Sequence, residues 1–368
     1  MASRPVYLDC NASMPMRPEA VAACMEGLAL AGNPASVHAP GRKARAALER
    51  ARAVIAGAVG ADARNVVLTS GATEANFLAM SQTSGRRAVS AVEHPSILEA
   101  GAAARIGVDR NGIIDPASLD IALSSGPTLV SIMLVNNETG VIQDIEALSG
   151  QIREAGALLH VDAVQALGRI PVDIDRLGAD MISISAHKIG GPRGIGALVL
   201  RDGLEIDAVF RGGGQERRRR GGTENVAGAM GFAAAIDAVA GDETVRIAAL
   251  RERLEGALAG EAEIVARDVA RVINCTALAM PGVSSAVQVM NFDLEGIAIS
   301  AGSACSSGKV SRSHVLDAMG TEREIADSTI RVSIGWTTTE AEIDRFTDVW
   351  RAILARCATR RVPVSGSA

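Results

Sequence analysis

The chain has 368 residues, of which 48% are hydrophobic, 21% are charged and only 2% are aromatic, and its net charge is −5. So large an apolar fraction can form a sizeable core, which excludes a disordered protein, and the length predicts two domains of unequal size. The acidic balance and the shortage of aromatic rings disfavour nucleic-acid binding, because phosphates need a basic surface and bases stack on aromatic side chains.

Five cysteines are scattered along the chain: Cys10, Cys24, Cys275, Cys305 and Cys357. No two of them form a C-x-x-C pair, so they indicate neither a zinc site nor a redox dithiol. The first residues, MASRPVYLDC, lack the apolar segment of a signal peptide, and apolar stretches such as 128–135 are too short to cross a membrane. We therefore expect a cytoplasmic protein with reduced thiols and no membrane partner.

Hydrophobic periodicity predicts alternating helices and short apolar strands in the first two thirds of the chain. In chain order these are helices at 18–30 and 41–59, a strand at 66–69, a helix at 73–80, a strand at 88–92, a helix at 95–104, a strand at 129–135, a helix at 145–155, and strands at 158–161, 181–184 and 196–200. Strands that are apolar on both faces and separated by helices predict an α/β fold with a mostly parallel sheet covered on each side. Ligands bind beyond the carboxyl ends of such strands.

The pattern changes near residue 225. It predicts long helices at 224–240 and 243–259, strands near 271–276 and 286–291, a helix near 294–299, a strand near 329–334 and a last helix at 339–355. We interpret this part as a smaller α/β domain that begins near residue 245.

Three polar motifs follow predicted strands. The turn Ser70-Gly71-Ala72-Thr73-Glu74 leads into a helix, where free N–H groups and the helix dipole favour a phosphate. An ordinary capped helix start explains the same residues equally simply. Asp162 and Lys188 end two later strands, and a strand-end lysine beside a glycine-rich loop is a candidate for a Schiff base with an aldehyde, although an isolated loop lysine is more often solvated.

Together, these motifs supply what pyridoxal phosphate requires: a phosphate site, an acid for the pyridine nitrogen and an amine for the aldehyde. The lysine is conspicuous because Lys43, Lys188 and Lys309 are the only lysines of the chain. His94 also follows a predicted strand and could stack on the cofactor ring, or simply begin a helix.

The sequence resembles the cysteine desulfurases of pyridoxal-phosphate fold type I, in the class-V aminotransferase group. The matching segments run in order through nearly the whole chain: 7–9, 32–38, 69–74, 93–94, 135–140, 162–165, 185–188, 220–226, 303–307 and 330–333. The resemblance implies a three-layer, mostly parallel sheet of seven-stranded type in a large cofactor-binding domain at 14–245. It also implies a small domain formed by 1–13 and 246–368, which carries the catalytic cysteine loop at about 301–312.

The resemblance also implies roles for individual residues. Lys188 would bind pyridoxal 5'-phosphate covalently, Asp162 would pair with the pyridine nitrogen, and His94 would stack on the ring and move protons. The other residues implied are the phosphate-binding Ala72, Thr73, Ser185 and His187, the ring-hydroxyl partner Gln165, the substrate-binding Asn137 (also near the cofactor) and Arg331, and Thr223, which would reach the phosphate of a neighbouring subunit in a homodimer.

Cys305 lies in a run of small residues, 301–308, which predicts an exposed segment. By the resemblance, L-cysteine is the substrate, Cys305 accepts its sulfur as a persulfide, and L-alanine leaves. The Ser-Ala-Cys-Ser-Ser setting resembles the branch that serves iron–sulfur cluster assembly and nitrogen fixation, which implies a sulfur-acceptor or scaffold protein as partner and Cys305 as a possible transient cluster ligand shared with it.

Some alternatives stay open from the sequence. The chain departs from the family at Asp9-Cys10-Asn11-Ala12-Ser13-Met14 and at 310–313, which weakens any inference about the acceptor protein. A selenocysteine lyase, or another lyase or aminotransferase of the same fold, would need the same cofactor residues. The arginine run at 217–220 could bind phosphates in a nucleic-acid-binding or scaffold protein, but the net charge argues against it. No G-x-G-x-x-G follows the first predicted strand, so a nicotinamide dehydrogenase is disfavoured.

Overall fold

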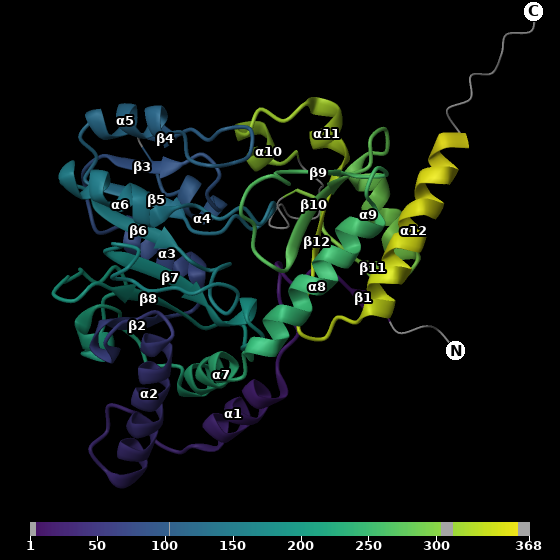
Figure 1. The fold of residues 1–368 in the computed structure, drawn as a ribbon. Helices are drawn as coiled ribbons and strands as arrows, with labels where there is room; N and C mark the ends of the chain where they lie inside the picture. Colours follow the sequence, from purple (N-terminus) through teal and green to yellow (C-terminus); the bar gives the residue numbers. More distant parts are fainter. Residues whose placement is uncertain (1–4, 103, 303–311, 360–368) are drawn as a thin grey trace, which may run out of the picture.

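A seven-stranded sheet forms the centre of the computed structural model, which describes residues 5–102, 104–302 and 312–359 (Figure 1). The strand order is β2-β8-β7-β6-β5-β3-β4, and β8 alone in this order runs antiparallel to its neighbours. The strands are β2 (Val66–Thr69), β3 (Arg87–Ser90), β4 (Ala104–Ile106), β5 (Leu129–Met133), β6 (Leu158–Asp162), β7 (Met181–Ser185) and β8 (Gly196–Leu200). The predicted mostly parallel α/β sheet is confirmed.

Alternate residues of each strand face two different cores, because side chains along a strand point to opposite faces. Along β8, Ala197 and Val199 face one core, whereas Leu198 and Leu200 face the other. The first core includes residues of α2 (Ala39–Gly57), α5 (Pro116–Ser124), α6 (Ile145–Glu154) and α7 (Val226–Asp237), and the second includes residues of α3 (Ala72–Met80) and α4 (Pro95–Leu98). Helices therefore cover both faces of the sheet and give three layers. Helix α1 (Pro18–Ala29) packs against α7 at the edge of this body.

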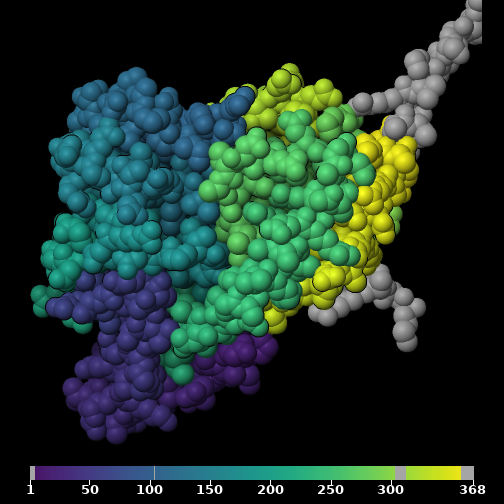
Figure 2. Space-filling model, in the orientation of Figure 1, coloured from purple at the N-terminus to yellow at the C-terminus, as the bar shows by residue number. Residues whose placement is uncertain are grey.

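A second group of elements lies beside the large sheet, in green and yellow in Figures 1 and 2 except for the N-terminal strand β1, which is purple in Figure 1. Strands β12 (Thr329–Ser333), β10 (Cys275–Ala279) and β9 (Glu263–Ile264) form an antiparallel sheet, and β1 (Val6–Tyr7) pairs with β11 (Ile297–Ala298). The helices of this group are α8 (Gly241–Ala257), α9 (Ser285–Leu294), α10 (His314–Ala318), α11 (Arg323–Ser328) and α12 (Glu340–Thr359). The predicted boundary at residue 245 stays a prediction, and it falls inside α8.

Three of the eight aromatic residues lie in the core of this second group. Phe292 of α9 stacks on Phe346 of α12 with 4.6 Å between ring centroids, and Trp350 lies beside them. All three side chains are fully buried, so α9 and α12 pack against each other through large apolar surfaces. Among the described helices, none has the length and apolar character that crossing a membrane requires.

Three predicted elements are wrong. The predicted helix at 95–104 ends after one turn at Leu98, and Ala104–Ile106 becomes strand β4 beside β3. The predicted strand at 286–291 belongs to helix α9, whose start is capped by the Ser284 side chain, which accepts a hydrogen bond from the Val287 N–H. The predicted helix at 294–299 is interrupted by Gly296, which has a φ of +72° and leads into β11.

Backbone strain is concentrated in one turn of the glycine-rich segment at 212–222. Glu216, Arg217 and Arg218 have φ angles of +44°, +56° and +67°, a left-handed conformation that costs a non-glycine residue about 1–2 kcal/mol. The buried Glu216 carboxylate holds the turn, because it pairs with Arg52 at 2.6 Å and accepts a hydrogen bond from the Leu68 N–H at 2.9 Å. The arginine run is therefore partly a structural feature of this turn.

Replacing Arg218 by glycine should relieve part of this strain. We expect Arg218→Gly to raise the free energy of unfolding by about 1 kcal/mol, measured by urea denaturation. The matched control is Arg211→Gly, which should lower stability by about 0.5 kcal/mol, since Arg211 is exposed directly before this segment and has no positive φ. Equal losses in both variants would contradict this account of the turn.

Candidate active site

A cavity of about 500 Å³ lies beyond the carboxyl ends of β6 and β7. It collects most of the residues that the sequence predicted, although they come from positions 72 to 331 of the chain. The predicted residues that line it are Ala72, Thr73, His94, Asn137, Asp162, Gln165, Ser185, His187, Lys188 and Arg331. The topology thus brings them together where an α/β sheet binds its ligands.

Asp162 ends strand β6 with its side chain in the cavity wall. The residue is only 5% exposed, and its two carboxylate oxygens accept hydrogen bonds from the Asn76 amide at 2.9 Å and the Val164 backbone N–H at 3.0 Å. A buried carboxylate needs such donors, or a cation, to offset its lost hydration. Asp162 is therefore held in place as an anionic group that faces the cavity.

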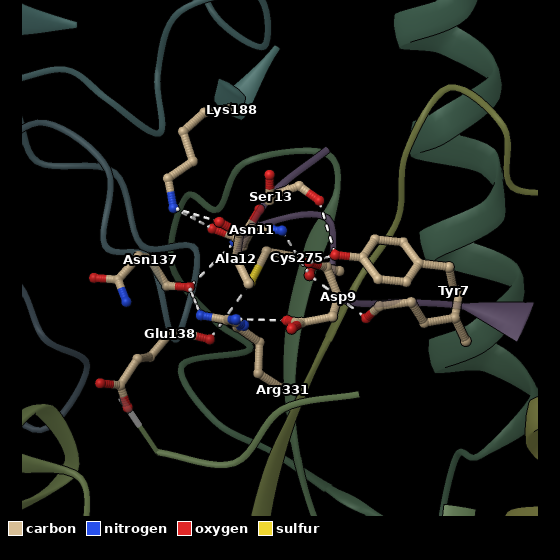
Figure 3. A network of polar contacts seen from close by, with 12 residues as sticks. Tyr7, Asp9, Asn11, Ala12, Ser13, Asn137, Glu138, Lys188, Cys275 and Arg331 are labelled. Atoms are coloured by element: carbon tan, nitrogen blue, oxygen red, sulfur yellow. Dashed lines mark hydrogen bonds and ion pairs between the residues drawn. The ribbon is translucent and has the colours of Figure 1, made fainter. Parts of the chain in front are cut away.

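Lys188 follows β7 on the short helical turn Ala186–Lys188. Its Nζ donates hydrogen bonds to the backbone carbonyls of Asn11 at 2.6 Å and Ala12 at 3.1 Å (Figure 3). The amine is thus directed into the cavity by a segment near the start of the chain. No sequence pattern indicated that this segment would reach Lys188.

Arg331 enters the cavity from strand β12 of the smaller sheet and is 3% exposed. One of its terminal nitrogens donates to Asp9 at 2.7 Å and the other to the carbonyl of Asn137 at 3.0 Å (Figure 3). Burial lowers the pKa of this guanidinium, but the combined effect of Asp9, Cys275 and Glu138 outweighs burial, so the pKa is raised. Arg331 is therefore a fixed cation beside Asn137, suited to a carboxylate ligand.

The start of helix α3 lies on the same cavity and has no side-chain cap. Its first N–H groups are therefore available to a ligand, and the capped-helix alternative for this turn does not hold. The Ser185 hydroxyl is buried and lacks a hydrogen-bond partner among the described residues. Burial, followed by the neighbouring cations Lys188 and Arg193, lowers the pKa of His187 to about 4, so this side chain is neutral at pH 7.

His94 begins the short helix α4, and its Nδ1 accepts a hydrogen bond from the Ser96 backbone N–H at 3.1 Å. An accepting Nδ1 carries no proton, so the neutral ring has its proton on Nε2. Burial lowers the pKa of His94, and the charges of Lys188 and His314 lower it further, against the opposite effect of Asp162. His94 therefore begins a helix and also lines the cavity, and its stacking on the cofactor ring stays a prediction.

Of the predicted residues that the structure describes, Thr223 is not brought to this cavity. Thr223 lines a neighbouring cavity of about 110 Å³, which shares Ser70 and Gly194 with the larger one. Cys305, including its suggested part as a metal ligand, lies outside the described residues. Within the ranges that the structure describes, no group of three metal-binding side chains is found.

Sequence reasoning missed three residues that shape the site: Asn11, Asn76 and Arg169. Asn76 lies one helical turn after Ala72 and Thr73, a spacing that could have indicated it. The Asn11 carbonyl accepts from both Lys188 and the Gln165 amide, and Arg169 bonds to Gln165. Only the folded chain brings these last two to the site.

Comparison with known proteins identifies the family of this chain. Residues 6–346 match the family model for aminotransferase class-V. A curated relative from Dictyoglomus turgidum, "Cysteine desulfurase IscS", is 39% identical over 97% of this chain and 96% of its own length, and "Cysteine desulfurase" of Cereibacter sphaeroides is 39% identical over 94% of each chain. The chain belongs to the cysteine desulfurases of the class-V aminotransferase family.

Solved structures agree with this assignment. The NifS-like protein from Rickettsia africae is 35% identical, with a TM-score of 0.88 over 96% of this chain and all of that one. A structure described as "SspA in complex with cysteine" is 28% identical, with a TM-score of 0.80 over 91% of this chain and all of that one.

The cysteine desulfurases of this family depend on pyridoxal phosphate, and so does this enzyme. The cavity residues fit that cofactor. The uncapped start of α3 and the unpartnered Ser185 hydroxyl suit the phosphate, Asp162 suits the pyridine nitrogen, and the Lys188 amine suits the aldehyde.

Lys188→Ala should abolish the covalent attachment of the cofactor. We expect the purified variant to lose the yellow absorption band of bound pyridoxal phosphate, and borohydride reduction to leave its peptides unlabelled. The exposed Lys43 on α2 provides the control, because Lys43→Ala should keep both the band and a label on the peptide that contains Lys188. An undiminished band in Lys188→Ala would refute the assignment.

Proposed function

We propose that this enzyme converts L-cysteine to L-alanine and that Cys305 receives the sulfur as a persulfide. The observation that carries this proposal is the meeting of Lys188, Asp162 and Arg331 at one cavity in a chain related over almost its whole length to cysteine desulfurases. Bound pyridoxal phosphate would supply an aldehyde for the amine and a ring that withdraws electrons from the substrate.

The residues of the chain divide the remaining tasks. The Arg331 guanidinium, beside Asn137, binds the α-carboxylate of the substrate and fixes its orientation. The Asp162 carboxylate keeps the pyridine nitrogen protonated, since an anion at this buried position favours a proton on its partner. Lys188 would hold the cofactor aldehyde, and its amine, once free, would be placed to move the α-proton of the substrate. His94, neutral and with its proton on Nε2, lies on the same cavity as a ring partner and second proton carrier.

The sulfur transfer balances with Cys305 as the nucleophile. The thiolate attacks the sulfur of the substrate, a sulfur–sulfur bond forms, and the bond between that sulfur and the substrate Cβ breaks. The carbon keeps the electron pair and takes up a proton, so that L-alanine leaves and Cys305 carries a persulfide. The thiolate is the reactive form of cysteine, so a reducing compartment is needed to regenerate it.

The proposal also includes a second subunit of the enzyme and a protein that accepts the sulfur. Thr223 lies in a cavity next to the phosphate site, which supports a homodimer in which it reaches the cofactor of the neighbouring subunit. A relative bears the name IscS, which supports the delivery of sulfur to an iron–sulfur scaffold or another acceptor protein in the cytoplasm. Cys305 would then hold the sulfur at the point of transfer.

A cysteine substitution tests the sulfur chemistry directly. Cys305→Ala should reduce the release of alanine from L-cysteine by about 100-fold or more while cofactor binding is retained. The control is Cys357→Ala, because the half-buried Cys357 lies on α12, away from the cavity residues, and should leave the rate unchanged. Alanine release at the full rate in Cys305→Ala would overturn the persulfide mechanism and favour another lyase of the same fold.

A further inference from the structure

Arg169 is a buried arginine directly behind the cavity. It is 8% exposed, and its guanidinium donates to three acceptors: the backbone carbonyl of Gln165 at 2.8 Å, the side-chain oxygen of Gln165, and the backbone carbonyl of Lys188 at 3.1 Å. Arg169 thus bonds to two residues of the cofactor cavity without lining that cavity itself.

The charge of Arg169 is unusual because it has no acidic partner. Among the described residues, no carboxylate lies within ion-pair distance of its guanidinium, whereas the buried Arg17 pairs with Glu243 at 2.6 Å. The ionisable groups whose charge affects the pKa of Arg169 are the thiols of Cys275 and Cys10 and the guanidinium of Arg331. Burial lowers the pKa of Arg169 to about 10, so it remains a cation at neutral pH.

An unpaired buried cation is costly unless an anion compensates it. Two of the three hydrogen bonds of Arg169 go to Gln165. We therefore expect the compensating anion to bind beside Gln165. The guanidinium has only donors and therefore requires the oxygen of the Gln165 amide to face it. The Gln165 nitrogen then points the other way, donates one hydrogen to the Asn11 carbonyl at 3.0 Å, and keeps a second hydrogen in the wall of the cavity.

We propose that Arg169 is a positioning residue that orients and polarises the Gln165 amide, so that its N–H binds the anionic ring oxygen of pyridoxal phosphate. Linked hydrogen bonds strengthen one another in a buried site. The Arg169 charge therefore acts on the ring oxygen through the Gln165 amide that connects them. The positive charge also disfavours a proton on the nearby linkage between Lys188 and the cofactor. The inference rests on cofactor binding in this cavity, and it requires neither Cys305 nor desulfuration.

The test is a pH titration of the visible absorption band of the bound cofactor, in the absence of cysteine. Removal of the positive charge in Arg169→Met should favour the protonated linkage and raise the pH midpoint of the spectral change by about one pH unit or more. In a Gln165→Met background, the same substitution should raise the midpoint by much less, because the connecting amide is gone. An equal rise in both backgrounds, or none in either, would overturn the proposal.

Two further variants separate this role from a structural one. Arg17→Met removes a buried arginine that bonds to the Ile189 carbonyl and pairs with Glu243, and it should lower the unfolding temperature without moving the midpoint. If Arg169→Met does not fold, Arg169→Lys decides the question. The lysine keeps the charge but cannot reach Gln165 and the Lys188 carbonyl together, so the midpoint should rise by about half a pH unit, and an unchanged midpoint would contradict the proposal. Either negative result would leave the desulfurase assignment intact, because cysteine turnover is not measured.

Discussion

The arrangement of the site depends on one buried anion, the carboxylate of Asp162 at the end of β6. Its lost hydration is offset by two donors, one from its own turn at Val164 and one from Asn76 on helix α3. The bond to Asn76 ties α3 to the edge of the sheet, which places the uncapped start of that helix on the same cavity as the carboxylate. Nearby Glu93 is fully buried, and burial together with Asp162 holds its pKa well above the usual range, so Asp162 carries the negative charge of this region.

The second constraint is the segment around Asn11, which joins the two sheets at the cavity. Its carbonyl accepts from Lys188 and Gln165, and its backbone N–H donates to the hydroxyl of Ser333, the last residue of β12. Its side chain contacts Asn274 and the Asn137 carbonyl. Figure 3 shows this segment between Lys188 and Arg331. Lys188 follows a strand of the large sheet and Arg331 lies in the smaller sheet. Asn11 links them, because it bonds to the Lys188 amine and to the Asn137 carbonyl that Arg331 also contacts.

Much of this organisation follows from local sequence patterns. Apolar strands separated by amphipathic helices predict the large sheet, and the positions of Asp162 and Lys188 after two of those strands predict where a ligand binds. The pyridoxal-phosphate dependence and the desulfurase family are confirmed by the relatives. The roles of the individual site residues, including Lys188, Cys305 and Thr223, stay predictions.

The rest required the folded chain, for two physical reasons. In the smaller domain, tertiary packing and caps override short patterns: the β-branched residues near Val287 suggest a strand, but the Ser284 cap and the stacking of Phe292 on Phe346 favour a helix. Asn11 and Arg169 act through backbone carbonyls and an amide, and such contacts leave no signature in residue type or spacing.

The central claim is that sulfur leaves L-cysteine by transfer to Cys305. The most direct measurement is mass spectrometry of the holoenzyme after one turnover with L-cysteine and no reductant. The account predicts one additional sulfur atom on the peptide that contains Cys305, together with one equivalent of alanine. Stoichiometric alanine with every cysteine of the chain unmodified would contradict it.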